Sequence, residues 1–126
     1  VESLSRARLR SDLWAAQLEG TPAANVHVST PVVDGAVRAR MFAAELGIGE
    51  DPATGSASGP LGARLVRHGL LEPNADGTAQ LVITQGVEIH RPSRIEVEVD
   101  IRGAGITGVR VGGGCALVAR GRMRRP

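Results

Sequence analysis

The chain has 126 residues, with fifteen Arg, no Lys, thirteen acidic residues and a formal net charge of +2. This length suffices for one domain with a buried core, and the lack of Lys excludes catalysis through a Schiff base. One Trp, one Phe and no Tyr cannot form a surface on which nucleobases stack, so we expect no nucleic-acid partner.

The one cysteine, Cys115, excludes an internal disulfide. It lies in the apolar run 115–119, which favours a strand in which the thiol packs against its neighbours. No apolar run has the length of a membrane span, and no signal peptide is visible. We therefore expect no membrane partner and a cytoplasmic location.

The N-terminal segment, residues 1–20, predicts a helical lead-in. Ser11 and Asp12 are typical of a helix N-cap, several apolar residues follow, and Gly20 is a typical stop. Before this helix, alternate Arg residues fit either a strand or a loop.

Two strands are predicted next, from the alternation of apolar and polar residues. Residues 25–30 place two valines on one face and His27 and Ser29 on the other, which is typical of a half-exposed strand. A proline and an Asp-Gly pair then predict a turn, after which residues 37–42 alternate again.

The following stretch, residues 49–57, is a polar, Gly-rich turn that leads into a helix predicted over residues 56–68. This helix is largely apolar, and apolar helices are usually buried. Its first amides therefore need partners, and Thr54, Ser56 and Ser58 are candidate N-caps.

The same stretch supports two interpretations. In the first, it is only a capped helix after a turn. In the second, the amides of residues 55–59 bind an anion at the positive end of the helix dipole, beside the carboxylate of Asp51. A carboxylate next to an anion site suits acid–base catalysis.

Beyond the helix, the pattern predicts strands only. They cover residues 80–85, 95–101, 106–111 and 115–119, and the three glycines before the last one indicate a bulge or a tight hairpin. One apolar helix with about six strands suits a sheet that curls around the helix.

Several separate motifs resemble, in their order and spacing, the second half of the phenazine-biosynthesis PhzF-like isomerase family. The resemblance extends from about Val26 to Met123. The motifs are residues 40–43, 49–57 and 59–61, then Gln85-Gly86, Arg91-Pro92-Ser93 and residues 109–113.

The resemblance implies a diaminopimelate-epimerase-like fold, in which two similar halves each curl a mixed sheet around a central helix. We accordingly expect an α+β fold, with residues 1–126 forming a single domain that corresponds to one such half. Residues 1–20 would be its helical lead-in and residues 25–123 its sheet and central helix. The resemblance also implies an active site between the halves that uses no cofactor and no metal. The sequence likewise shows no His, Cys and Asp grouping with metal-ligand spacing.

In this family a carboxylate removes a proton from carbon and returns it elsewhere, while amides at the helix ends hold the anionic groups of a small metabolite. Carried over by motif, the catalytic residues are Asp51 and Ser56. The substrate-binding residues would be Thr54, Gly55, Ala57, Arg91 and Ser93.

The sequence departs from the family pattern in two ways. His90 stands where the family has Gly before Arg-Pro-Ser, and because His does not easily adopt a positive φ, we expect a loop of different shape. His90 is either a surface substitution or an added contact near the site. The main proton-abstracting Glu belongs to the first half, and neither Glu45 nor Glu50 lies in its motif.

Two functional hypotheses follow. In the first, the chain is half of an isomerase or epimerase whose site is completed by an N-terminal half domain. In the second, it is a non-catalytic module that binds an anion or pairs with a second copy of itself through the face that the other half would cover.

Overall fold

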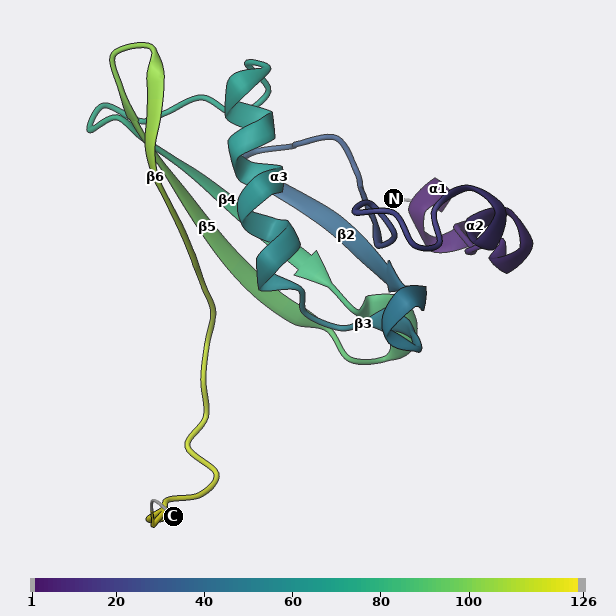
Figure 1. The fold of residues 1–126 in the computed structure, drawn as a ribbon. Helices are drawn as coiled ribbons and strands as arrows, with labels where there is room; N and C mark the ends of the chain where they lie inside the picture. Colours follow the sequence, from purple (N-terminus) through teal and green to yellow (C-terminus); the bar gives the residue numbers. More distant parts are fainter. Residues whose placement is uncertain (1, 125–126) are drawn as a thin grey trace.

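The computed structural model describes residues 2–124, which form one sheet around a central helix (Figure 1). The helices are α1 (Glu2–Arg6), α2 (Ser11–Gln17) and α3 (Gly55–Arg67), with short 3-10 helices η1 (Ala44–Leu46) and η2 (Val87–Ile89). The strands are β1 (Val26–Ser29), β2 (Ala36–Ala43), β3 (Ile48–Asp51), β4 (Thr78–Gln85), β5 (Ser93–Arg102) and β6 (Gly105–Gly112).

The six strands form a mixed sheet. Their order is β1-β2-β4-β5-β6, and β3 also pairs with β2. β2 and β4 run parallel, whereas the other strand pairs of the described chain are antiparallel. A parallel pair needs a crossover connection, and here the chain crosses through β3 and α3. The predicted α+β fold, a curled mixed sheet around one helix, is confirmed.

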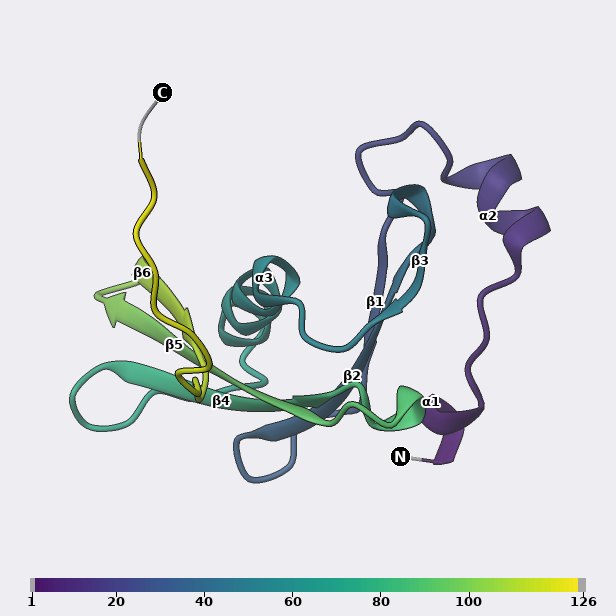
Figure 2. The same ribbon diagram turned by 90° about the horizontal axis from the view of Figure 1, so that it is seen from below.

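Helix α3 lies in the hollow of the curled sheet, over β4, β5 and β6 (Figure 2). Its glycines allow a close approach: a Cβ at Gly62 would stand 2.8 Å from Cγ1 of Val97. Burial of this helix against aliphatic strand residues supplies the main apolar core. The core residues are Val37, Ala39, Leu65, Leu71, Ala79, Leu81, Ile83, Ile95, Val97 and Val99.

The C-terminal run, residues 115–119, is not a strand, and that prediction is wrong. Strand β6 forms the edge of the sheet and ends at Gly112, after which the chain leaves the sheet (Figure 1). Leu117 and Val118 are 78% and 93% exposed, and Cys115 is exposed instead of packed. An apolar run becomes a strand only where another strand pairs with it, and none among residues 2–124 does so.

Two further elements differ from the sequence-based expectation. The sixth strand is β3, Ile48–Asp51, most of which was predicted as part of a Gly-rich turn over residues 49–57. The segment before Ser11 contains helix α1 in place of a strand or loop, and Ser11 is the first helical residue of α2 rather than its cap. None of the helices described here is both long and apolar enough to cross a membrane.

Candidate active site

Asp51 ends β3 and stands beside the first turn of α3. Its backbone pairs with Met41 of β2, which fixes its place in the sheet. Its carboxylate Oδ2 accepts a hydrogen bond of 2.5 Å from Oγ1 of Thr54. Thr54 occupies the N-cap position of α3, but its side chain does not cap the helix. The hydroxyl that could have capped the helix therefore orients the carboxylate instead.

Gln85, at the end of β4, connects the residues of this corner of the fold, where β3 ends and α3 begins. It is fully buried, and its Nε2 donates to the backbone oxygen of Asp51 at 2.7 Å and to Oγ1 of Thr54 at 2.9 Å. One amide group thus links the end of β3, the start of α3 and the end of β4. Buried polar links of this kind hold a site in a single geometry.

The first turn of α3 carries backbone amides that have no partner inside the helix. Ser58 donates its amide to Thr54 at 3.1 Å, so the helical pattern begins there. The amides of Gly55, Ser56 and Ala57 precede that bond, and no acidic residue lies in this turn. Gly55 and Ser56 are exposed. Such a helix end attracts an anion through its amides and its dipole.

A second loop, residues 86–93, closes against this corner. Gly86 has a φ of 79°, and a Cβ there would lie 2.3 Å from the oxygen of Arg91 and 2.9 Å from that of Pro52. Only Gly allows this contact, because a side chain would collide with both carbonyls. The contact brings the loop of Arg91 and Ser93 beside the turn after Asp51.

Between the two loops lies a groove of about 650 Å³ that reaches the start of α3. Gly55 and Ser93 both line it, opposite Val111 of β6. Ser93 donates its hydroxyl to the backbone oxygen of Arg91 at 3.3 Å, and Arg91 itself is exposed. The structure therefore gathers Asp51, Thr54 and the first turn of α3 at one corner, with Ser93 at the groove. Within residues 2–124, no group of three His, Cys, Asp or Glu residues could hold a metal ion.

His90 adopts the backbone conformation that Gly would favour. Its φ is 59° and its ψ is 28°, which is the left-handed region, and it ends the 3-10 helix η2. His is among the residues that enter this region more often than most. The expectation that His90 would avoid a positive φ is therefore wrong, and a loop of different shape from the family's stays a prediction.

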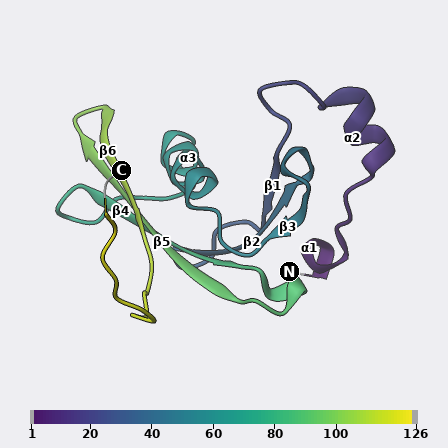
Figure 3. The same cartoon turned by 60° about the horizontal axis from the view of Figure 1, so that its bottom comes forward.

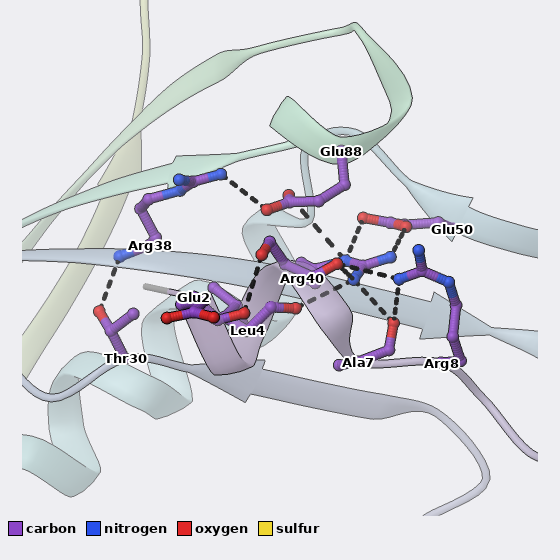
Figure 4. Close-up of polar contacts among 10 residues, drawn as sticks. Glu2, Leu4, Ala7, Arg8, Thr30, Arg38, Arg40, Glu50 and Glu88 are labelled. Carbon is purple, nitrogen blue, oxygen red and sulfur yellow. Dashed lines mark hydrogen bonds and ion pairs between the residues drawn. The ribbon is translucent and has the colours of Figure 1, made fainter.

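Glu50, the neighbour of Asp51, is held by a buried arginine. Arg40 of β2 is only 4% exposed and donates to both carboxylate oxygens of Glu50, at 3.0 and 2.7 Å (Figure 4). Hydrogen bonding to Glu50 raises the pKa of Arg40 above its usual value. Glu45 is exposed. That neither glutamate takes the family's Glu role stays a prediction.

Arg40 also fastens α1 to the sheet. Its Nη1 donates to the backbone oxygens of Leu4, Ser5 and Ala7 at 3.0, 3.3 and 2.8 Å (Figure 4). Oε2 of Glu88 lies 3.9 Å from Nε of Arg40, and Oε1 of Glu88 forms an ion pair with Nη2 of Arg38 at 2.6 Å. A cation at the C-terminal end of a helix is favourable. Through its bonds to Glu50, Arg40 also holds strand β3.

Sequence reasoning assigned His27 only to the polar face of a strand. In the structure its Nε2 is buried, and burial lowers the pKa of its imidazole. The pairing of β1 with β2 sets this environment, and no local pattern encodes that pairing.

Comparison with known proteins places the chain in a family. The family model described as "Phenazine biosynthesis-like protein" matches residues 2–121. The chain is 45% identical to an uncharacterized isomerase of Deinococcus radiodurans over 96 residues, covering 76% of this chain and 30% of the relative. It is 44% identical to the trans-2,3-dihydro-3-hydroxyanthranilate isomerase of Pseudomonas aeruginosa, covering 68% of this chain and 29% of that protein.

The fold has a solved counterpart. The crystal structure of the Bacillus anthracis phenazine biosynthesis protein, PhzF family, matches with a TM-score of 0.61 and 28% identity. The match covers 79% of this chain and 34% of that one. The chain thus spans about 30% of the length of the curated relatives it matches. Because the family model covers nearly all of its residues, the chain belongs to the phenazine biosynthesis-like, or PhzF-like, protein family.

Proposed function

We propose that the chain supplies one half of a cofactor-independent isomerase that moves a proton within a small carboxylate-bearing metabolite. One observation carries this proposal: the carboxylate of Asp51 is held by Thr54 beside the amides of the first turn of α3, which have no partner inside the helix. An acid–base group next to an anion site is the arrangement that a proton shift next to a carboxylate requires. Membership of a family that includes isomerases supports it.

In the proposed reaction, a C–H bond of the substrate breaks and a carboxylate takes the proton. The electron pair spreads into the neighbouring unsaturated system, and a proton is returned at a second position, so nothing is oxidised or reduced. Asp51 assists the transfer of the proton, and Ser56 lies in the adjoining turn. The amides of Gly55, Ser56 and Ala57 hold the anionic group as charge develops.

The proposed site is completed by an N-terminal half domain that faces this corner. The curated relatives are about three times as long as the matched part, since the chain covers only 30% or 29% of them. We infer that the missing part carries the main proton-abstracting Glu that the resemblance implies. The small anionic metabolite would lie in the groove beside Gly55 and Ser93. Arg91, two residues before Ser93 in the same loop, would contact it from outside the groove lining.

The relative from Pseudomonas aeruginosa is named for trans-2,3-dihydro-3-hydroxyanthranilate, a cyclic unsaturated acid with one carboxylate. We propose a substrate of this chemical class. It would carry one carboxylate, which the amides of α3 bind, and an acidic C–H next to an unsaturated system that is conjugated with the carboxylate.

The test uses this chain assembled with an N-terminal half domain and trans-2,3-dihydro-3-hydroxyanthranilate in deuterated water. Proton NMR follows isomerisation and deuterium uptake. Asp51→Asn should lower turnover by roughly 100-fold or more, the usual contribution of one acid–base group. Glu45→Gln, an exposed carboxylate three residues before β3, is the control and should keep turnover. Full activity of the Asp51→Asn assembly would remove Asp51 from the mechanism.

The alternative is a non-catalytic module that binds an anion or pairs with a second copy. The edge strand β6 favours it, because its Val109 and Val111 are 41% and 40% exposed, and Val111 lines the groove. Its expected signature is anion binding by the chain alone as a homodimer, with no solvent deuterium entering the ligand. Deuterium uptake catalysed by the chain alone would exclude this alternative.

A further inference from the structure

His27 and Asp51 lie on the same row of the sheet. His27 of β1 pairs with Met41 of β2 from one side, and Asp51 of β3 pairs with Met41 from the other. Directly paired residues in antiparallel strands place their side chains on the same face. Figure 3 shows β1, β2 and β3 side by side near the beginning of α3.

Gln85 belongs to the same face. It pairs with Ala39, which stands two residues before Met41 on β2, so both point to the same side. Its Nε2 is used twice, for Asp51 and Thr54, but its Oε1 is buried and has no hydrogen-bond partner within the described residues. A fully buried amide oxygen requires a donor.

The matching donor is His27. Its Nε2 is also buried and also lacks a partner with hydrogen-bond geometry among residues 2–124. The Gln85 side chain nevertheless acts on the imidazole as a hydrogen-bond partner and raises its pKa, against the larger lowering by burial. Two buried atoms of complementary type, each in need of a partner, therefore lie on one face of the sheet.

We propose that His27 is a positioning residue of the site: its Nε2–H donates to Oε1 of Gln85 and thereby fixes which end of that amide faces Asp51. The inference rests on the proposed function only in its effect on turnover. The hydrogen bond itself is a property of this chain alone.

The amide orientation matters because Thr54 has one hydroxyl proton. With Nε2 facing Thr54, Oγ1 accepts from Gln85, and its proton goes to Oδ2 of Asp51. If the amide turned over, its oxygen would face both Oγ1 of Thr54 and the backbone oxygen of Asp51. The hydroxyl proton would then go to Gln85, and the carboxylate would lose its donor.

The first measurement is the tautomer of His27, from long-range proton–nitrogen NMR correlations of the chain alone. Protonated Nε2 and unprotonated Nδ1 are expected, together with Gln85 side-chain amide protons that exchange slowly. An imidazole protonated at Nδ1 only would overturn the proposal, whatever the activity.

Two variants separate a donor from simple packing. His27→Gln places an amide nitrogen near the position of Nε2, whereas His27→Asn places it near Nδ1. The Asn variant should lose the slow exchange of the Gln85 amide, and the Gln variant should keep it. Backbone amide spectra verify that both are folded. Equal exchange in the two variants would contradict the assignment of Nε2 as the donor.

The same variants are then tested in the assembled enzyme with trans-2,3-dihydro-3-hydroxyanthranilate. His27→Asn should lower kcat by roughly tenfold or more with little change in KM, because small misplacements of a reacting group are costly. His27→Gln should restore kcat. If the tautomer is as expected but Asp51→Asn keeps full turnover, the proposed function fails and the hydrogen bond stands. If Asp51→Asn is inactive while both His27 variants are fully active, the positioning role fails.

Discussion

His90 carries a backbone cost that one substitution can remove. The residue is exposed and its φ is 59°, a region that costs a non-glycine residue about 1–2 kcal/mol. His90→Gly removes this cost, although Gly gains freedom in the unfolded chain, so we expect a net gain of roughly 0.5 kcal/mol. His90→Val, with a branched side chain, should lose about 1 kcal/mol or more. Urea unfolding gives both values, and a Gly variant no more stable than the Val variant would contradict this interpretation.

His27 gives the folded chain a pH dependence whose sign is fixed. Burial lowers the pKa of its imidazole below the usual 6.5. The unfolded state therefore binds more protons once the pH falls below about 6.5. The stability that neutral His27 contributes is fully present above that pH and is lost as the pH falls toward the folded pKa. Its neighbours on this face are neutral Gln85 and, across Met41, Asp51.

The measurement compares the wild-type chain with His27→Gln by thermal unfolding at about pH 7.5 and about pH 5. Both proteins lose stability on acidification through their carboxylates, but the wild type should lose more. The additional loss belongs to His27. A parallel decline of the two proteins would show that the imidazole is not buried in its neutral form.

Among the elements, those with a strong local pattern were predicted and those made by pairing were not. The strands corresponding to β1, β2, β4, β5 and β6 and the helix α3 all followed from alternation or from apolar composition. Strand β3 is four residues, Ile-Gly-Glu-Asp, and its extended form depends on pairing with β2 and on the bond from Arg40 to Glu50. The apolar run 115–119 shows the opposite case: it was predicted as a strand, but no strand among residues 2–124 pairs with it.

The candidate site likewise has one part that a local sequence motif predicts and another part that depends on strand pairing. Asp51 and the first turn of α3 are close in the sequence, so a motif could place them together. The connection of Gln85 and His27 to Asp51 depends on strand register, across β4, β2 and β1, which the sequence does not display. A polar residue at an inward position of a predicted strand was the available signal, and Gln85 at the end of β4 provided it.

Helix α3 offers a test of how closely it packs on the sheet. Gly62→Ala would place a Cβ 2.8 Å from Cγ1 of Val97, in the buried core. Overpacking should outweigh the gain in helix propensity and destabilise the fold by roughly 1–2 kcal/mol. Adding Val97→Ala should recover part of that overpacking loss.

Gly59 in the same helix is the matched control. A Cβ there would lie 3.3 Å from side-chain atoms of Val109 and Val111, which are partly exposed on the edge strand β6. Those side chains can move, so Gly59→Ala should be close to neutral or slightly stabilising. Calorimetry of the variants gives the comparison. Equal losses at Gly59 and Gly62 would mean that helix α3 does not approach β5 more closely than β6.

At the scale of the whole molecule, the two ends of the chain are attached very differently. At the N-terminal end, Leu4 is buried, and Leu4 and Ser5 of α1 and Ala7 just after it supply three backbone oxygens to the guanidinium of Arg40 (Figure 4). At the other end, residues 115–124 are exposed and belong to no helix or strand (Figure 1). The contrast predicts opposite responses to shortening.

A chain that begins at Ser11 loses the burial of Leu4 and leaves Nη1 of Arg40 without its acceptors. We expect a loss of about 3 kcal/mol from the two causes together. A chain that ends at Cys115 keeps the groove residues and should change stability by less than about 0.5 kcal/mol.

Urea unfolding of both shortened chains, together with the Arg40→Met variant of the full chain, separates the loss of Leu4 burial from the loss of the Arg40 hydrogen bonds. Met removes the buried cation but keeps the apolar stem, so it should lose stability through the unpaired Glu50. If the N-terminal truncation were as stable as the C-terminal one, α1 would not be part of the folded unit, and Arg40 would have to find its acceptors in solvent.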